Sequence, residues 1–463
     1  MNKFDDLFNF KKNKNNLALI SDDRDVTYSQ LHSLTEDIKS HINQNSLVLL
    51  VCKNTIDSIV AYLGILKSGA ACVMIKERNF SFLLETYNPK FVFAPKEIEL
   101  SIGKKIFEMG EYALYENQEN ISYRINKDLS ILLSTSGSTG TPKFVKISYK
   151  NIISNTESIL DYLQIKKSDR AITTMPMNYS YGLSIINTHL SCGASIVVTE
   201  ASLVSRELWN LMKSKNVTNF GGVPYSYEML KKLRFERLDL PSLRYITQAG
   251  GKLDESLTKY FYEICYKKGI NFIVMYGQTE ATARISYLPK SDLPKKIGSI
   301  GIPIPGGKLI LRDDNGKEIK KDNEIGELTY FGDNVCLGYS HNCFDLDKKD
   351  ENEGCLETGD LAYMDNEGYF FITGRKNRFI KVFGNRVNLD EFQKIVQDFG
   401  LECVCSGEDD LIKIFVTNDT FSENELFKYL MQKTGLNKSS YKLIKLNAIP
   451  RNESGKVLYS QLK

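Results

Sequence analysis

A run of nine mostly small, polar residues carries the clearest chemical signal in this sequence. Hydroxyl groups can donate hydrogen bonds to phosphate oxygens, and glycines can take the positive φ that lets successive backbone amides converge on one anion. A lysine at the end adds a positive charge. The run is Thr135-Ser136-Gly137-Ser138-Thr139-Gly140-Thr141-Pro142-Lys143. It is predicted to bind the phosphates of a nucleotide, and an ordinary polar surface loop is the alternative.

The residues on either side of this run indicate a hairpin. Residues 129–134 are typical of a short buried strand, and residues 144–148 alternate like a second strand. A Walker-type phosphate loop has a helix that begins at its lysine, whereas Pro142 precedes Lys143 here and a strand follows. The glycines also lack the spacing of a dinucleotide-binding fingerprint. Kinase, GTPase and dehydrogenase functions are therefore disfavoured.

Four later segments carry groups that suit nucleotide chemistry. Paired glycines let a flat ligand lie on bare backbone. In another segment, the ring of Tyr276 could stack a base, the hydroxyl of Thr279 could contact a phosphate, and the carboxylate of Glu280 could hold Mg²⁺. Taken singly, each segment also has an ordinary explanation as a turn, a packed tyrosine, a helix cap or a solvated lysine. The segments are Gln248-Ala249-Gly250-Gly251-Lys252, Met275-Tyr276-Gly277-Gln278-Thr279-Glu280, Thr358-Gly359-Asp360 and Asn452-Glu453-Ser454-Gly455-Lys456.

The composition limits the classes of protein that these residues can serve. The chain has 463 residues, 42% of them hydrophobic and 25% charged, with a formal net charge of +3. These values are typical of a soluble globular protein with more than one domain. Basic stretches are short, so no nucleic-acid partner is expected. No apolar run is long enough to span a membrane, and the acidic start does not resemble a signal peptide, so we expect a cytoplasmic protein without an integral membrane segment.

The nine cysteines and four histidines form no recognisable motif. No C-x-x-C pair occurs, and Cys403 and Cys405 fall in a strand-like run where they would point to one face. Free buried thiols are expected rather than a zinc site. Histidine-based catalytic triads are disfavoured.

The predicted elements suggest how the chain positions its motifs. Strand-like and helix-like segments alternate over the first two thirds, which predicts an α/β layered domain. One helix is expected between Asn54 as N-cap and Gly69 as C-cap. From about Lys295, short strands with turn glycines predict an antiparallel or barrel-like subdomain. After Gly374, a strand, a helix over residues 390–399 and further strand-helix pieces predict a small α+β domain.

In this order, the segments TSGSTGTPK, YGQTE, TGD, GRKNRFIKVFGNR and SGK resemble the AMP-forming adenylating superfamily of acyl-CoA synthetases, non-ribosomal peptide adenylation domains and luciferases. The resemblance covers nearly the whole chain. It implies an α/β fold with a large N-terminal domain of α/β and barrel-like subdomains, residues 1–376. A small mobile α+β C-terminal domain, residues 377–463, would follow, with the active site between the two. In the family, a carboxylate attacks the α-phosphate of ATP to give an acyl-adenylate and pyrophosphate, and a thiol then takes the acyl group.

The resemblance also implies a role for each motif. The β- and γ-phosphates of ATP would contact Thr135, Ser136, Gly137, Ser138, Thr139, Gly140 and Lys143. Adenine would lie against Gly250, Gly251, Tyr276 and Gly277, and ribose would contact Asp360 and Arg375. Thr279 would reach the α-phosphate, Glu280 would hold Mg²⁺, and Arg386 would lie near the phosphates in one domain orientation.

Lys456 matches the family's catalytic lysine, which bridges the attacking carboxylate and the α-phosphate. A fixed cation brings two anions together and stabilises the charge that develops on the phosphoryl oxygens. No general base is required, because a carboxylate is already ionised near pH 7. The family rotates its C-terminal domain between half-reactions, which would bring the loop at Gly384 to the thiol channel. Asn377 falls at the hinge, where the family usually has Asp or Lys, so this sequence departs from the pattern there.

The acid pocket is expected around residues 175–182, where acyl-CoA synthetases often have a histidine at the position of Tyr179. Amino-acid-activating members place an aspartate in this region, but no acidic residue occurs between Arg170 and Thr199. A buried ammonium without a counter-charge is costly, so a standard α-amino acid is disfavoured. The other pocket candidates are Gly221, Gly222, Tyr225, Gln248 and Ala249.

Together these assignments predict an acid–thiol ligase that uses ATP and Mg²⁺. Its partners would be a small-molecule carboxylic acid and either coenzyme A or the phosphopantetheine of an acyl carrier protein. A small or medium acyl group is expected, and a long fatty acid stays open. The alternatives are an enzyme that adenylates an amino acid and loads it onto a carrier protein, and a nucleotide-binding module that has lost the chemistry.

Overall fold

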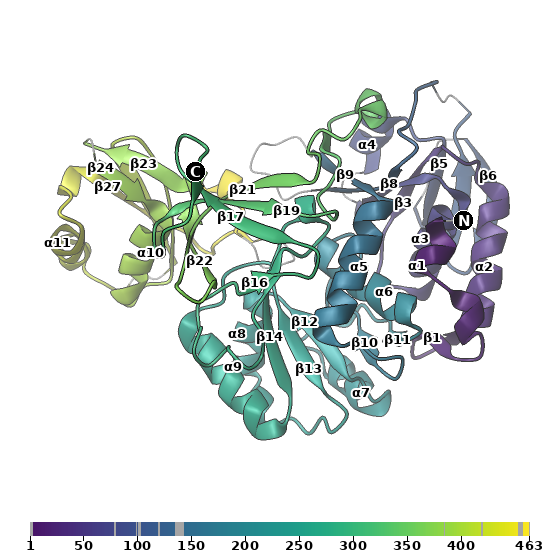
Figure 1. Ribbon diagram of the computed structural model, residues 1–463, viewed down its shortest axis with the longest axis horizontal. Coiled ribbons are helices and arrows are strands. Elements are labelled where there is room, and N and C mark those ends of the chain that lie inside the picture. The colour runs from purple at the N-terminus through teal and green to yellow at the C-terminus, as the bar shows by residue number, and fades with distance from the viewer. Residues whose placement is uncertain are drawn as a thin grey trace. The chain divides into compact units, whose positions relative to one another are not determined.

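A computed structural model describes the chain except residues 1–2, 78–79, 99, 101–102, 119–120, 135–142, 384, 418–419, 452–456 and 463 (Figure 1). The described residues group into two compact units. Unit 1 contains those of Met1–Gly137, Thr141–Lys308 and Tyr330–Leu356, and unit 2 contains those of Leu309–Thr329 and Glu357–Lys463. The division into domains after residue 376 stays a prediction.

One sheet of unit 1 has the order β16-β15-β14-β13-β12-β10-β11-β1-β2. Its middle strands are parallel, as expected where helices connect successive strands. The strands are β1 (Leu17–Ile20), β2 (Asp25–Thr27), β10 (Arg170–Ile172), β11 (Ser195–Val197), β12 (Asn219–Gly222), β13 (Tyr245–Gln248), β14 (Asn271–Tyr276), β15 (Ser286–Tyr287) and β16 (Ile302–Pro303). The helices along this part of the chain are α5 (Tyr149–Leu163), α6 (Ser180–Cys192), α7 (Arg206–Ser214), α8 (Pro224–Lys232) and α9 (Glu255–Lys268).

The other large sheet of unit 1 has the order β20-β9-β8-β4-β3-β5-β7-β6. Its strands are β3 (Leu47–Val51), β4 (Ala71–Ile75), β5 (Phe91–Pro95), β6 (Lys104–Met109), β7 (Tyr112–Glu116), β8 (Leu129–Ser134), β9 (Phe144–Ser148) and β20 (Tyr339–Ser340). The helices that accompany it are α1 (Lys3–Leu7), α2 (Tyr28–His41), α3 (Ile56–Ser68) and α4 (Phe80–Tyr87). Strands β8 and β9 are antiparallel, which confirms the hairpin predicted around the phosphate-binding run.

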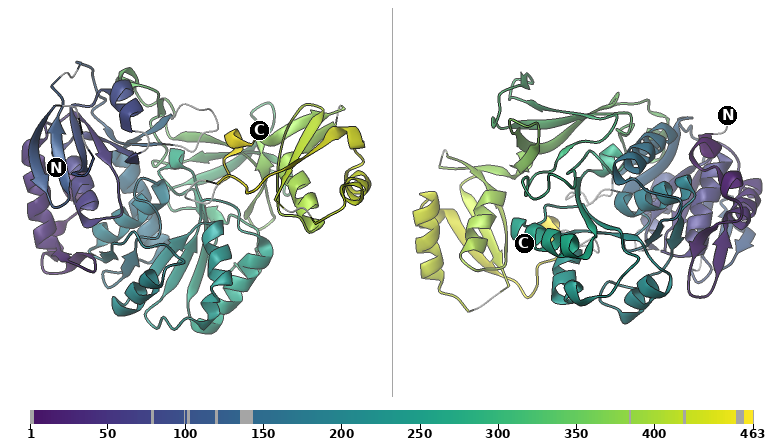
Figure 2. Two further views of the ribbon diagram at one scale, coloured as in Figure 1. Left: turned by 180° about the vertical axis from the view of Figure 1, so that it is seen from behind. Right: turned by 60° about the horizontal axis from the view of Figure 1, so that its bottom comes forward.

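Helices α5 and α6 lie between the two sheets (Figures 1 and 2). Their apolar faces share a core with the second sheet, where Ile152 and Leu183 join Ile131 and Val145. The opposite side of α6 faces the first sheet, and Tyr181 packs in a second cluster with residues of β13 and β14. Both sheets therefore bury one face against the same pair of helices, which fixes the start of α6 with respect to the strand ends.

The cap of α3 differs from the prediction. Gly69 ends the helix with a φ of +79°, as expected, but Thr55 rather than Asn54 is the N-cap, and the Thr55 hydroxyl accepts from the Ser58 amide. The side chain of Asn54 is used elsewhere, because its amide bonds the carbonyl of Met175 at 3.1 Å and the N–H of Met177 at 3.0 Å. Asn54 therefore fixes the loop that leads into α6.

Most printed strand pairs of unit 2 are antiparallel, as predicted for the chain after Lys295, but β26 (Leu411–Val416) and β27 (Tyr441–Lys445) are parallel. A five-stranded sheet has the order β18-β17-β19-β21-β22. Its strands are β17 (Lys308–Arg312), β18 (Glu318–Ile319), β19 (Gly326–Phe331), β21 (Cys355–Met364) and β22 (Phe370–Arg375). The following elements are the hairpin β23 (Phe379–Val382) and β24 (Asn385–Asn388), helix α10 (Leu389–Asp398), β25 (Cys403–Glu408), β26 (Leu411–Val416), helix α11 (Glu423–Thr434) and β27 (Tyr441–Lys445).

The last part of unit 2 has its own apolar core, in which Phe392 and Val396 of α10 pack with Ile412 and Ile414 of β26. Cys403 and Cys405 are free and buried there, as predicted. In the part of the chain that the structure describes, no His, Cys, Asp and Glu side chains gather in a group of three or more that could hold a metal ion. No described helix is long and apolar enough to cross a bilayer.

Candidate active site

The candidate residues of unit 1 meet at the carboxyl ends of three parallel strands. Gly222 of β12 is in register with Gln248 of β13, and Gln248 is in register with Val274 of β14. The segments that follow these strands therefore leave the sheet at one edge. In open α/β sheets this edge is where ligands bind, because loops and helix N-termini converge there. The structure thus brings together the predicted adenine and acid-pocket segments, which lie more than 20 residues apart in the sequence.

The paired glycines after β13 form a bare surface next to an aromatic ring. Gly250 has a φ of +83°, and a Cβ built there would lie 2.7 Å from the Tyr179 hydroxyl. A Cβ on Gly251 would lie 3.1 Å from Pro224. Side chains at either position would be strained or crowded, so backbone faces the space beside Tyr179. This arrangement suits a flat ring, as the adenine assignment requires.

The other pocket candidates differ in how they are used. Ala249 is buried, and the buried Gln248 donates its amide to the carbonyl of Gly251 at 2.8 Å, so this side chain holds the glycine turn. A Cβ on Gly221 would lie 2.7 Å from the Tyr181 hydroxyl. Tyr225 is 44% exposed on the first turn of α8. At this edge of the sheet the Tyr181 side chain is therefore buried, whereas that of Tyr225 is largely exposed to solvent.

The loop after β14 presents the next group of candidates. Thr279 and Glu280 lie in a short 3₁₀ turn, and the Thr279 hydroxyl is 3.3 Å from that of Ser180 at the start of α6. A Cβ on Gly277 would lie 1.8 Å from the carbonyl oxygen of Ala283, so only glycine lets this loop fold back on itself. Ala283 has a φ of +115°, an unfavourable value for a residue with a side chain.

Glu280 is held by a residue that the sequence analysis missed. The Tyr339 hydroxyl donates to Oε1 of Glu280 at 2.7 Å, and the ammonium of Lys143 lies 3.8 Å from the centre of the Tyr339 ring. Burial, followed by the negative charge of Glu280, raises the pKa of Tyr339, so the phenol stays protonated and donates. Tyr339 belongs to β20, which pairs with β9 next to Lys143. Only sheet pairing brings these residues together, and no sequence motif surrounds Tyr339.

This arrangement fits a magnesium nucleotide. Mg²⁺ is usually bound by one or two carboxylates together with substrate phosphates. Glu280 offers one oriented carboxylate, and Lys143 places a positive charge on the other side of the Tyr339 ring. The rest of the predicted phosphate-binding run, from Thr135 to Gly140, lies outside the described residues.

Unit 2 carries the candidate ribose pair. Asp360 of β21 and Arg375 of β22 are opposite each other in the ladder, and Nε of Arg375 lies 3.1 Å from Oδ1 of Asp360. Asp360 is buried and Arg375 is exposed. The Thr358 hydroxyl accepts from the Asp360 amide and donates to the carbonyl of Leu328, which fixes the turn before the aspartate.

The remaining candidates also belong to unit 2. Asn377 lies in a 3₁₀ turn over Lys376–Arg378, and the backbone of Arg386 pairs with Lys381 in the hairpin of β23 and β24. Gly384 and Lys456 lie outside the described residues. Arg451 and Val457, two described residues of this part of the chain, form an antiparallel bridge.

Comparison with known proteins shows a family and a fold. A family model described as "AMP-binding enzyme" matches residues 8–340. The chain is 24% identical to a 2-succinylbenzoate–CoA ligase of Listeria monocytogenes, with 96% of each chain covered. It is also 24% identical to an oxalate–CoA ligase of Arabidopsis thaliana, over 80% of this chain and 78% of the relative. The solved O-succinylbenzoate coenzyme A synthetase of Bacillus subtilis with ATP and magnesium has a TM-score of 0.79 and 22% identity, covering 100% of this chain and 99% of that one. The predicted fold class is thereby confirmed.

Proposed function

Because this chain belongs to the AMP-binding enzyme family, we propose that its site activates a carboxylic acid with ATP and passes the acyl group to coenzyme A. The family resemblance seen in the sequence is confirmed, and the enzyme is an AMP-forming acid–thiol ligase that uses ATP and Mg²⁺. The roles of individual residues and the choice of acceptor are part of the proposal.

The first half-reaction joins two anions. A carboxylate oxygen of the acid attacks the α-phosphorus of ATP, and the bond to the leaving pyrophosphate breaks, which gives an acyl-adenylate. Thr279, whose hydroxyl lies beside that of Ser180, would donate a hydrogen bond to an α-phosphate oxygen. Glu280, which accepts from Tyr339, would hold the Mg²⁺ of the nucleotide, and the bound ion would neutralise charge that develops on the phosphate oxygens. Lys456 brings the two reacting anions together, as its family counterpart does.

In the second half-reaction the sulfur of the acceptor attacks the acyl carbon and AMP leaves. We choose coenzyme A as acceptor because the relatives above are named as CoA ligases. Since the reaction consumes ATP and coenzyme A, we place the enzyme in the cytoplasm.

The observation that carries this proposal is the Lys143–Tyr339–Glu280 contact. It joins a cation and a neutral phenol to a carboxylate on the loop after β14, the strand that pairs with β13 and so lies next to the strand that precedes the paired glycines. A purely scaffolding module has no need for an oriented carboxylate there. Adenylation of an α-amino acid is disfavoured because no acidic residue occurs between Arg170 and Thr199.

The test is ATP–pyrophosphate exchange with a panel of carboxylic and amino acids. We expect exchange with at least one carboxylic acid, and a fall of about 100-fold or more in Lys456→Ala, the range seen when one charge-stabilising group is removed. The product would then be offered coenzyme A or a phosphopantetheine-bearing carrier protein. Exchange with α-amino acids alone, or an unchanged rate in Lys456→Ala, would contradict the proposal.

A further inference from the structure

Arg284 is a buried cation without a counter-charge among the residues that the structure describes. Its side chain is 3% exposed, and no described carboxylate forms an ion pair with it. Other buried charged groups are paired, since Asp57, Lys67, Lys146, Asp169 and Asp360 each contact an opposite charge. An unpaired buried charge is strongly unfavourable, so Arg284 needs a specific explanation.

The guanidinium makes long hydrogen bonds and a side-chain contact with Tyr162, but no hydrogen bond to a described residue through Nε. One terminal nitrogen donates to the carbonyl of Ala283 at 3.3 Å, the other is 3.5 Å from the Ser184 hydroxyl, and Nε has no partner. A guanidinium has five N–H donors arranged to bind a carboxylate with two parallel hydrogen bonds. The group lies 4.2 Å from the centre of the Tyr181 ring. Burial raises the pKa values of Tyr162 and Tyr179, and the positive charge of Arg284 offsets part of this rise.

The position of Arg284 is fixed through its backbone. The side-chain amides of Asn155 and Asn334 both donate to its carbonyl, at 3.2 Å and 2.8 Å. Asn334 also bonds the carbonyl of Ala281, so one side chain holds both ends of the segment that follows Glu280. The backbone of Arg284 is therefore fixed within the loop that carries Thr279 and Glu280.

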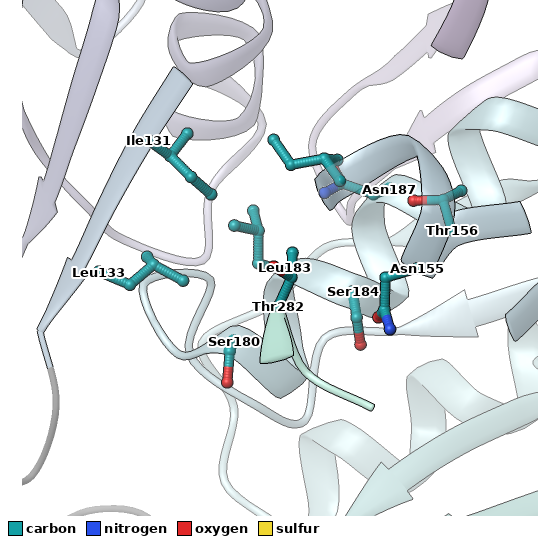
Figure 3. Close-up of a pocket in the computed structure, with 10 residues that line it drawn as sticks. Ile131, Leu133, Asn155, Thr156, Ser180, Leu183, Ser184, Asn187 and Thr282 are labelled. Carbon is teal, nitrogen blue, oxygen red and sulfur yellow. The ribbon is translucent and has the colours of Figure 1, made fainter. Parts of the chain in front are cut away.

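A row of hydroxyl groups connects Arg284 with the reacting end of the site. Ser184 contacts Arg284, Ser180 contacts Thr279, and the two serines lie four residues apart on one face of α6, about 6 Å along the helix axis. Both line a cavity of about 10 Å³, room for a single water molecule, together with Thr282. Figure 3 shows the hydroxyl groups of Ser180 and Ser184 pointing to the same side, away from Ile131 and Leu133.

We propose that Arg284 binds a second carboxylate on the substrate, so that this enzyme activates a short dicarboxylic acid. One carboxylate would be activated beside Thr279, and the other would pair with Arg284 near Ser184 and the Tyr181 ring. The proposal rests on the proposed function of the site. A bound carboxylate supplies the counter-charge that Arg284 lacks, whereas a substrate ammonium would be repelled.

The test compares straight-chain dicarboxylic acids with monocarboxylic acids of matched length in ATP–pyrophosphate exchange. We expect kcat/KM to be at least ~30-fold higher for the best dicarboxylic acid, since a buried charge pair discriminates by this much or more. Arg284→Gln should abolish the preference, mainly by raising KM for the dicarboxylic acid, and Arg284→Lys should keep part of it. Arg206→Gln, at an exposed position on α7, is the matched control and should leave the preference unchanged.

The ratio between the two acid classes separates this role from a merely structural one, because a folding defect lowers both rates together. Equal rates with both classes in the parent enzyme, or an unchanged ratio in Arg284→Gln, would overturn the inference. If Arg284→Gln does not fold, the ratio of kcat/KM for the two acid classes in the parent enzyme and in Arg284→Lys tests the inference. If no acid supports exchange, the proposed function fails, and thermal protection by a dicarboxylic acid in the presence of AMP still tests Arg284. Protection that is lost in the variant supports the role, and its absence contradicts it.

Discussion

Tyr339 is a side chain on which two charged groups of unit 1 depend. Its hydroxyl orients Glu280, and its ring lies under the ammonium of Lys143. A ring that contacts a cation gains electrostatic energy, and a phenol that donates to a carboxylate limits the rotation of that carboxylate. Tyr339 is therefore expected to position the proposed metal ligand Glu280 and the proposed phosphate contact Lys143.

Replacing Tyr339 with Phe removes the hydroxyl and keeps the ring. Because Glu280 then loses the group that orients it, the Mg²⁺ concentration for half-maximal pyrophosphate exchange should rise roughly 10-fold, the lower end of the range for such changes. Thermal stability should change little. Tyr123→Phe is the control, since the Tyr123 hydroxyl also donates a hydrogen bond, to the carbonyl of Asn88. An unchanged magnesium requirement in Tyr339→Phe would show that the contact does not position Glu280.

The loop between β14 and β15 is the element that gathers the most site residues. It carries Thr279, Glu280 and Arg284 within six residues, and it folds back because Gly277 allows the carbonyl of Ala283 to approach. Asn334 then holds the loop through the carbonyls of Ala281 and Arg284. One tight turn therefore places the proposed α-phosphate contact, the proposed metal ligand and the buried cation.

Gly277→Ala tests this role of the loop. The added methyl group would lie 1.8 Å from a backbone oxygen, so the loop has to move. Misplacement by about 1 Å costs roughly 100-fold in rate, so kcat/KM for exchange should fall by that much, with a lower melting temperature. Gly269→Ala is the control, because its φ of +69° strains an alanine by about 1 kcal/mol but nothing lies within 4 Å of its Cβ. It should lower stability and leave kinetics unchanged. A kinetically normal Gly277→Ala would refute the argument.

The stability of unit 1 as a whole should depend on pH through His189. This residue of α6 is buried, hydrogen-bonds the carbonyl of Ile185 through Nδ1 and accepts from the Asn219 amide of β12 at Nε2. Burial lowers its pKa from 6.5 to about 4. The unfolded chain therefore binds a proton at a higher pH than the native protein, so this contribution to stability is present above pH 6.5 and is lost as pH falls toward 4.

We expect the free energy of unfolding of unit 1 to fall by roughly 3 kcal/mol between pH 6.5 and pH 4 because of His189. Other groups that titrate in acid would add to this loss. His189→Gln keeps both hydrogen bonds and cannot titrate, so its stability should fall less steeply. Urea unfolding followed by Trp209, the single tryptophan of the chain and a residue of unit 1, measures this. The exposed His341 provides the control, since His341→Gln should follow the parent curve. Parallel pH curves for the parent and His189→Gln would contradict the prediction.

Several features of the fold could be predicted because the sequence pattern that encodes each of them lies within one short segment. The hairpin around the phosphate-binding run, the C-cap at Gly69, the helix after residue 389 and the buried thiols follow from periodicity and residue type. The N-cap of α3 could not, because a distant loop competes for Asn54. Arg284 was missed as well. A lone arginine in the run Ala281–Ile285 is a weak signal until the structure shows that it is buried with no described carboxylate beside it.

The sequence by itself determined the chemistry, since the ordered motifs from Thr135 to Lys456 specify a nucleotide site and an acid-activating reaction. Motifs suffice for this because each contact with ATP is made by a short segment. Only the tertiary structure decided which side chains from distant parts of the sequence contact those motifs. Tyr339 reaches Glu280 through strand pairing, and Arg284 is buried without a carboxylate beside it among the residues that the structure describes. Such contacts depend on packing, which no local spacing encodes.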